Sequence, residues 1–122
     1  MGYRLMQVTG RRMADGSDGV FVSRVEADDW EHDEETGGLV HLLRADETVQ
    51  AGLWKPGAVA GKVIDVKLVA DETLLVLDGS GQLQVDGGPT LELRPGDMVS
   101  LQKGARTRWV VDAAFREFWV YS

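Results

Sequence analysis

The sequence predicts an all-β fold, with about ten short strands arranged as a sandwich or barrel. At 122 residues the chain has the length of one domain. Short runs rich in apolar and β-branched residues recur from residue 39 onwards, and turns containing glycine or proline separate them. No segment longer than about ten residues shows the apolar periodicity of an amphipathic helix. Such repeated short strands are typical of a sandwich or barrel.

The N-terminal region differs in amino-acid composition from the remainder of the chain. Residues 10–19 are turn-forming and charged, and we interpret them as an arm or loop. Residues 20–25 alternate well enough to predict a first strand. Residues 26–35 contain seven acidic residues and no Lys or Arg. We interpret this acidic segment as a solvated loop or a short helical turn, with a cation-binding or partner-docking loop as the alternative.

A series of strands is expected after Gly37-Gly38. They cover residues 39–43, 49–54, 63–69, 73–77, 82–85, 90–93, 98–101, 107–111 and 117–121. The turns between them include residues 55–57, 78–81, 86–89 and 94–97, where glycine supplies positive φ and proline fixes φ. The strands beside residues 86–89 form a predicted hairpin, in which Leu83 and Val85 share one half-buried face, as do Leu91 and Leu93.

Composition and charge exclude several classes of protein. The chain has no cysteine, which rules out disulfides and thiolate metal sites. Its net charge is −7, so nothing offsets repulsion from nucleic-acid phosphates. No apolar run approaches the ~18 residues of a membrane span, and the first residues lack the apolar stretch of a signal peptide. We therefore expect a cytoplasmic protein that binds neither nucleic acid nor membrane.

The spacing of residues between Gly52 and Trp109 carries a family resemblance. Glu72 is followed by six residues and Gly79. Gly96 is followed by five residues, then Gln102-Lys103-Gly104, two residues and Thr107. Gly52-Leu53-Trp54 lies upstream, and Trp109 comes five residues after the Lys-Gly turn. In these features residues 38–121 resemble the cupin superfamily, and more narrowly its single-domain ethanolamine-utilisation-like group, also called cupin-3 or DUF861.

The resemblance implies a single-domain cupin β-barrel, also described as a double-stranded β-helix or RmlC-like jelly roll. The barrel would cover residues 38–122. Residues 1–37 would then form an N-terminal extension, comprising the arm, the first strand and the acidic loop, packed on the barrel. Cupins of this size commonly pair, so the resemblance also implies a homodimer.

The histidines that hold a metal in cupins are absent from this sequence. Depending on the register, the positions of the family's His-x-His pair are taken by Val66 and Leu68 or by Asp65 and Lys67. Thr107 stands in place of the later histidine, so that only Glu72 remains of the ligand set. Iron, manganese or zinc in such a site needs about three imidazoles and a carboxylate. His41 is interpreted as a packed or edge residue of its strand, and we expect no metal and no cofactor.

Six residues are the candidates for a ligand site in the barrel lumen: Trp54, Glu72, Arg106, Thr107, Arg108 and Trp109. Glu72 is either a structural carboxylate, which accepts hydrogen bonds or pairs with Lys67 or Arg108, or a catalytic acid–base group. The two tryptophans belong either to the core or to the mouth of the lumen. The two arginines, with Lys103, form either a surface turn or a clamp for a small carboxylate or phosphate.

These observations favour a metal-independent cupin that binds or senses a small molecule, with anions among the candidates, in the lumen. One alternative is a small enzyme of the isomerase, lyase or hydrolase type, which uses Glu72 or a loosely held metal. The other is a structural or interaction protein with a filled barrel, docked through the acidic segment. A roomy polar lumen would favour the first two, and a filled apolar lumen the third.

Overall fold

The structure is a computed structural model that describes residues 14–15 and 19–122. Most of the predicted arm over residues 10–19 therefore lies outside the described residues. Apart from one short 3-10 helix, η1 (Gly57–Val59), the regular elements in the described region are β-strands. None of the helices described is long and apolar enough to cross a membrane.

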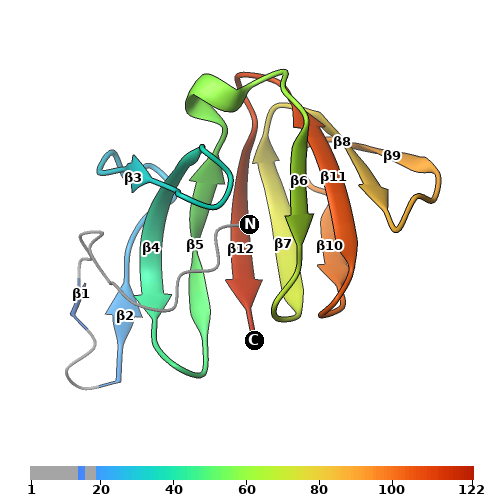
Figure 1. Ribbon diagram of the computed structural model, residues 1–122. Coiled ribbons are helices and arrows are strands. Elements are labelled where there is room, and N and C mark those ends of the chain that lie inside the picture. The colour runs from blue at the N-terminus through green and yellow to red at the C-terminus, as the bar shows by residue number, and fades with distance from the viewer. Residues whose placement is uncertain (1–13, 16–18) are drawn as a thin grey trace.

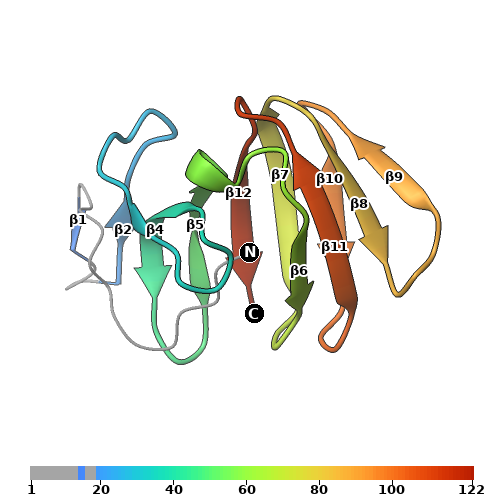
Figure 2. The same cartoon turned by 45° about the horizontal axis from the view of Figure 1, so that its top comes forward.

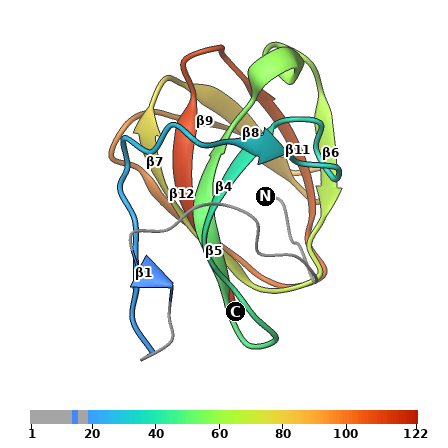
Figure 3. The ribbon, with the colours of Figure 1, turned by 90° about the vertical axis from the view of Figure 1, so that its left-hand side faces the viewer.

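Two antiparallel sheets form the body of the molecule (Figures 1 and 2). The six-stranded sheet has the order β10-β7-β12-β5-β4-β3, and the four-stranded sheet has the order β6-β11-β8-β9. Figure 3 shows β7 and β12 on one side of the molecule and β6 and β11 on the other. The strands are β3 (Glu31–His32), β4 (Leu39–Ala45), β5 (Gln50–Lys55), β6 (Ile64–Lys67), β7 (Glu72–Asp78), β8 (Gly81–Val85), β9 (Thr90–Leu93), β10 (Met98–Leu101), β11 (Arg106–Val111) and β12 (Arg116–Tyr121). The all-β prediction is confirmed, and each strand expected after residue 38 is present.

Alternation of side chains along the strands places one face of each sheet in a shared core. In β12, for example, Glu117, Trp119 and Tyr121 are buried and the residues between them are half-buried. The largest fully buried side chains include Trp54, Trp109, Trp119, Tyr121 and Phe115. Aromatic side chains from both sheets therefore supply much of the core area.

The predicted hairpin around residues 86–89 is present as β8 and β9, but one of its four apolar residues is not covered. Leu83 lies opposite Leu91 in the register. Leu83 is fully buried and Leu93 is 6% exposed, whereas Leu91 is 45% exposed. The reason is that β9 is the edge strand of its sheet, so its outer end has no neighbouring strand to cover it.

Two expectations for the N-terminal region were wrong. The strand predicted over residues 20–25 is limited to β2 (Phe21–Val22), which pairs with β1 (Ala14–Asp15). The acidic segment is not simply solvated, because it contains β3, in which Glu31 pairs with Val40 and His32 with Leu39. Pairing with an existing sheet edge outweighs the weak strand propensity of an acidic stretch.

Residues 21–30 pack on the outer face of β4, β5 and β12, and His41 anchors them there. This histidine is 1% exposed, in agreement with its interpretation as a packed residue. Its ring nitrogens lie 2.6 Å from Ser23 Oγ and 3.0 Å from the backbone oxygen of Asp29. The Arg116 guanidinium donates a hydrogen bond of 2.6 Å to the backbone oxygen of Val25. The N-terminal segment is thus held by polar contacts at several points.

The end of the acidic segment closes over the core tryptophan of β5. The Asp33 carboxylate, in a residue 1% exposed, accepts a hydrogen bond of 2.6 Å from Thr36 Oγ1. Thr36 Oγ1 in turn accepts hydrogen bonds from Trp54 Nε1 at 2.9 Å and from the Gly38 backbone at 3.1 Å. An acidic residue therefore orders the loop and satisfies the buried indole indirectly.

Replacing Asp33 with Ala tests this role of the acidic segment. The substitution removes a buried acceptor and loosens Thr36, so we expect the free energy of unfolding to fall by about 1–3 kcal/mol. Urea denaturation provides the measurement. Glu34→Ala is the matched control, because the Glu34 side chain is 87% exposed. Equal effects of the two substitutions would show that Asp33 is an ordinary solvated residue.

Candidate functional site

The alternation of side chains along β6 settles which residues occupy the positions of the missing histidine pair. Val66 and Leu68 are 5% and 2% exposed and belong to the core cluster. Asp65 and Lys67 point to the opposite face and are exposed. Val66 and Leu68 therefore take the interior positions, and hydrocarbon side chains stand where the family's histidine pair would be.

Thr107, which takes the place of the later histidine, is a buried structural residue. Its register partner on the neighbouring strand is Val66. The Thr107 hydroxyl donates a hydrogen bond of 2.8 Å to the Val66 backbone oxygen and accepts one of 3.0 Å from Trp109 Nε1. Both interactions lie in the core, so Thr107 joins β11 to β6 and fixes the indole of Trp109.

The structure places Trp54 and Trp109 in the core. They are 0% and 1% exposed. The Trp54 ring packs edge-on against Phe115 with a centroid separation of 6.1 Å. The indole nitrogens of both tryptophans are engaged by Thr36 and Thr107. Of the two interpretations from the sequence, the geometry agrees with core residues.

Arg106 and Arg108 do not join the interior candidates. They alternate with Thr107 and Trp109 along β11, and both are exposed. Arg108 Nε donates a hydrogen bond of 2.9 Å to Asp65 Oδ1 on the outer face. The expectation that all six candidates form one site was therefore wrong, because adjacent strand residues point to opposite faces. For the same reason, neither Arg108 nor Lys67 pairs with Glu72.

The interior carries four buried polar side chains on the six-stranded sheet, which we call the polar layer although they lie at two levels of the sheet. Glu72 on β7, Glu117 on β12 and Gln50 on β5 are each at most 1% exposed, as is Tyr121 on β12. In the register Tyr121 lies opposite both Glu72 and Gln50, whereas Glu117 lies opposite Val76 and Trp54. The sequence interpretation missed Glu117. The clue was available, because this glutamate alternates in phase with Trp119 and Tyr121.

The polar layer is reached from the end of the barrel where β12 ends, at the bottom of Figure 1. A hollow of about 170 Å³ opens there, and both Gln50 and Tyr121 line it. Asp46 and Glu47 from the β4–β5 turn also line it. Hydrogen bonds from Arg44 and from the backbone of Val49 hold the pKa of Asp46 well below its usual range, so this carboxylate remains ionised.

Comparison with known proteins identifies the family. The model of the EutQ-like cupin domain matches residues 43–119. This chain is a EutQ-like cupin. No curated protein sequence gives a significant match. The narrower resemblance predicted from Glu72, Gly79 and the later turns is thereby confirmed.

Solved structures agree on the fold of this EutQ-like cupin. A candidate ethanolamine utilisation protein Q from Salmonella typhimurium has a TM-score of 0.75 at 18% identity, with 95% of this chain and 97% of that chain covered. A cupin superfamily protein from Desulfitobacterium hafniense has a TM-score of 0.61 at 16% identity, with 77% and 82% covered. The EutQ protein of Clostridium difficile has a TM-score of 0.54 at 20% identity, with 69% and 63% covered.

The donor atoms of this EutQ-like cupin do not fit the metal that cupins usually hold. Val66, Leu68 and Thr107 stand at the positions of the three imidazoles, which leaves Glu72. Within residues 14–15 and 19–122, no group of three or more His, Asp or Glu side chains could hold a metal ion. Borderline metals need several nitrogen or oxygen donors at once, and a single carboxylate does not supply them.

Burial raises the pKa values of two groups in the polar layer, Glu117 and Tyr121. Burial is the main cause that raises the pKa of Glu117 to about 8, and the negative charge of Glu72 contributes to the same rise. Burial also raises the pKa of Tyr121 far above its ordinary value, again with a contribution from Glu72. At neutral pH Glu117 is thus a protonated carboxylic acid, which donates as well as accepts hydrogen bonds.

Substitution of Thr107 tests whether this residue supports the fold. Thr107→Val removes the bond to Val66 and leaves the buried Trp109 Nε1 without its acceptor, so we expect a loss of about 1–3 kcal/mol in the free energy of unfolding. Thr107→Ser keeps the hydroxyl and is expected to retain most of that stability in urea denaturation. If Thr107→Val were as stable as the wild type, the structural assignment would be wrong.

The raised pKa of Glu117 predicts a pH dependence of stability. Between about pH 4.5 and pH 8 the folded state holds a proton that the unfolded state has released. Stability from this group is complete at low pH and is lost as the pH rises, with a slope of up to about 1.4 kcal/mol per pH unit. Glu117→Gln, which cannot ionise, should therefore gain stability relative to wild type as the pH rises.

Urea denaturation at pH 5, 6, 7 and 8 gives the measurement. The difference in unfolding free energy between Glu117→Gln and the wild type is expected to grow steadily across this series. Glu47→Gln is the control, since Glu47 is exposed and its substitution should leave the wild-type pH profile unchanged. Parallel profiles for wild type and Glu117→Gln would contradict the raised pKa.

Proposed function

We propose that this EutQ-like cupin binds a small amine or a neutral polar molecule at the end of its barrel, without a resident metal. The observation that carries the proposal is the polar layer of Gln50, Glu72, Glu117 and Tyr121 beside an opening lined by two of its members. Buried carboxyls are costly to a fold, so the burial of Glu72 and Glu117, with Glu72 level with the open end of the barrel, favours a functional role.

The chemistry of the layer favours a ligand that donates hydrogen bonds or carries positive charge. Carboxylate oxygens of Glu72 accept hydrogen bonds, and the ionised Asp46 at the opening attracts cations. Tyr121 and protonated Glu117 add donors for a hydroxyl or carbonyl oxygen. The hollow of about 170 Å³ is smaller than the ~300–1,000 Å³ of drug-sized sites, which favours a ligand of a few heavy atoms.

The anionic ligand considered from the sequence is not favoured in this site. That suggestion depended on Arg106 and Arg108, which lie on the outer face of the four-stranded sheet. Inside the barrel, the negative charge of Glu72 would repel an anion, and neutral Glu117 offers no positive charge to offset the cost of its burial. The lumen therefore suits an amine or a neutral polar molecule better than a carboxylate or phosphate.

Metal independence is part of the proposal, and the donor set supports it. The chemistry of binding then depends on the protein's own carboxyl, amide and phenol groups. One structural relative is named for ethanolamine utilisation. Ethanolamine is a small amine with a hydroxyl group, so it combines both features that the polar layer favours and is the first probe to use. The proposal also includes a homodimer, which the family resemblance implies, and a cytoplasmic location, which the sequence led us to expect.

A second candidate function is acid–base catalysis by the two glutamates. A protonated Glu117, close enough to Glu72 to be affected by its charge, offers a general acid and a general base in the same buried interior, with a pKa near the working pH. This assignment moves the catalytic acid from Glu72, which was the candidate from the sequence, to Glu117. A reaction on the bound amine whose rate falls above pH 8 would favour the enzyme over the binding protein.

Calorimetric titration of protein dialysed against EDTA tests the binding proposal. We expect saturable binding of ethanolamine, or of another amine in a panel of similar size, with one site per chain. Glu72→Gln should weaken this binding at least about tenfold, which corresponds to about 1.4 kcal/mol. Glu92→Gln is the matched control, because Glu92 is exposed on β9, and it should leave the affinity unchanged.

Two outcomes would overturn this proposal. One is the failure of every small amine and every small neutral polar molecule tested to bind. The other is metal dependence, shown by near-stoichiometric metal in native protein on elemental analysis, or by binding that is lost with EDTA and restored by zinc, iron or manganese.

A further inference from the structure

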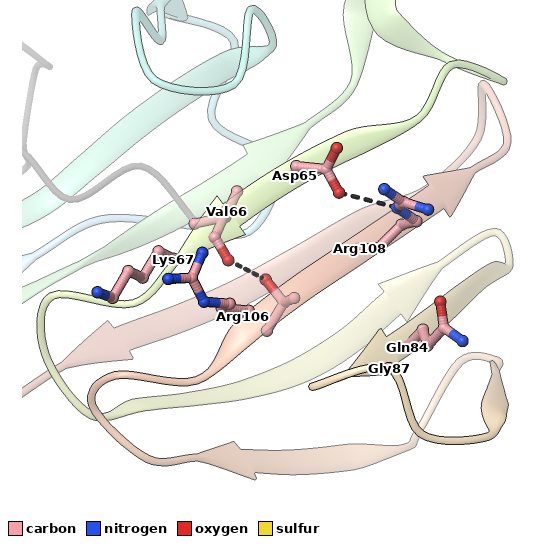
Figure 4. Close-up of a pocket in the computed structure, with 8 residues that line it drawn as sticks. Asp65, Val66, Lys67, Gln84, Gly87, Arg106 and Arg108 are labelled. Atoms are coloured by element: carbon pink, nitrogen blue, oxygen red, sulfur yellow. Dashed lines mark hydrogen bonds and ion pairs between the residues drawn. The ribbon is translucent and has the colours of Figure 1, made fainter.

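The outer face of the four-stranded sheet carries a hollow of about 480 Å³ that is separate from the barrel interior. Figure 4 shows side chains from β6, β11 and the β8–β9 region around it. Its side-chain lining comprises Asp65, Lys67, Gln84, Arg106 and Arg108, with Gly87 at the edge. The backbones of Val66 and Thr107 form its floor, while their side chains point into the core.

Two cationic side chains lie on neighbouring strands at one end of this hollow. Lys67 and Arg106 are direct cross-strand partners in the register of β6 and β11, and Figure 4 shows them side by side. Like charges in directly opposite positions destabilise a sheet. Within the described part of the chain, neither the Lys67 ammonium nor the Arg106 guanidinium has an ion pair. The juxtaposition therefore has an electrostatic cost that a bound anion would offset.

The other end of the hollow is electrically balanced. Arg108 Nε lies 2.9 Å from Asp65 Oδ1, and this carboxylate raises the pKa of Arg108 further. Counting the three cations and the one carboxylate of the lining gives a local charge of +2 on a chain whose net charge is −7. Positive charge is thus concentrated at the Lys67–Arg106 end.

The β8–β9 turn keeps the space above these two cations open. Asp86 and Gly87 have φ angles of 50° and 71°, and Gly87 has no side chain to extend over the hollow. The Asp86 carboxylate accepts a hydrogen bond of 2.9 Å from the Arg106 backbone, which fixes the turn against β11. Gln84 Nε2 donates to the Gly88 backbone oxygen at 2.8 Å, so the turn is also held from β8. The rim of the hollow is therefore ordered.

We propose that this hollow binds the phosphate group of a small molecule between Lys67 and Arg106. A guanidinium presents a planar pair of N–H donors, and an ammonium presents a compact charge with three donors. A phosphate dianion has enough oxygens to accept from both at once, and its charge of about −2 matches the excess at this end. A carboxylate carries half that charge and is expected to bind more weakly.

The phosphate site is independent of the amine site in the barrel. Val66 and Thr107 separate the two, since their side chains face the core and their backbones face the hollow. Substitution of Glu72 should therefore leave phosphate binding unchanged. Conversely, substitution of Lys67 should leave amine binding unchanged.

An NMR titration of the intact chain with inorganic phosphate, at constant ionic strength and neutral pH, tests the proposal. We expect saturable shifts of backbone amides in β6, β11 and the β8–β9 turn, and weaker binding of acetate. Lys67→Gln and Arg106→Gln should each weaken phosphate binding at least tenfold. Lys62→Gln and Arg94→Gln are the matched controls, because both residues are exposed cations outside the lining, and each should leave the affinity within twofold of wild type.

Three outcomes would overturn the proposal. One is the absence of saturable shifts in these strands. A second is equal weakening by all four substitutions, which would mean that phosphate responds only to overall charge. The third outcome concerns a competition experiment with a synthetic peptide of residues 26–35, the acidic segment. If the peptide bound the hollow more tightly than phosphate, the site would be a docking surface for a protein segment.

Discussion

The two-residue alternation of side chains along β6 and β11 is the constraint that keeps the outer hollow separate from the barrel interior. It directs Val66 and Thr107 into the core and Lys67 and Arg106 to the outer face. A slip of one residue would bury both cations, which is prohibitively costly without partners. The Thr107–Val66 hydrogen bond in the core and the Arg108–Asp65 pair outside fix this register from both faces.

The loss of imidazoles from the barrel changes the electrostatics of the glutamates that remain. A bound divalent ion is usually the largest local charge in its site, and it favours ionised carboxylates around it. Without such an ion, burial disfavours ionisation, and Glu117 has its pKa raised to about 8. Hydrogen bonding takes over part of the structural role of the ligands, since Thr107 connects β11 to β6 and Trp109. The same framework thus supports a neutral acid where relatives with histidines would support a cation.

The sequence predicted the barrel strands well, because alternating apolar residues and glycine-containing turns are local features. It failed where long-range pairing decides the structure. The strand β3 forms only because the edge of β4 is available to Glu31 and His32. The prediction of the candidate site was only partly correct, for a related reason. Glu72 was placed in the interior by the family spacing, whereas Glu117 belongs to no motif, and its interior position follows from the pairing of β12 with β5 and β7.

The barrel interior and the outer face of the β6–β11 pair have opposite electrostatic character, and this limits how the sites can communicate. The interior presents carboxyls and suits an amine, whereas the outer hollow presents Lys67 and Arg106 and suits a phosphate. A molecule bearing both groups cannot occupy both sites, because hydrogen-bonded backbone lies between them. Coupling between two ligands requires an element with two alternative arrangements that both ligands bias. The register of β6 and β11 is fixed from both faces, so this strand pair offers no such alternative, and the two sites are expected to bind independently.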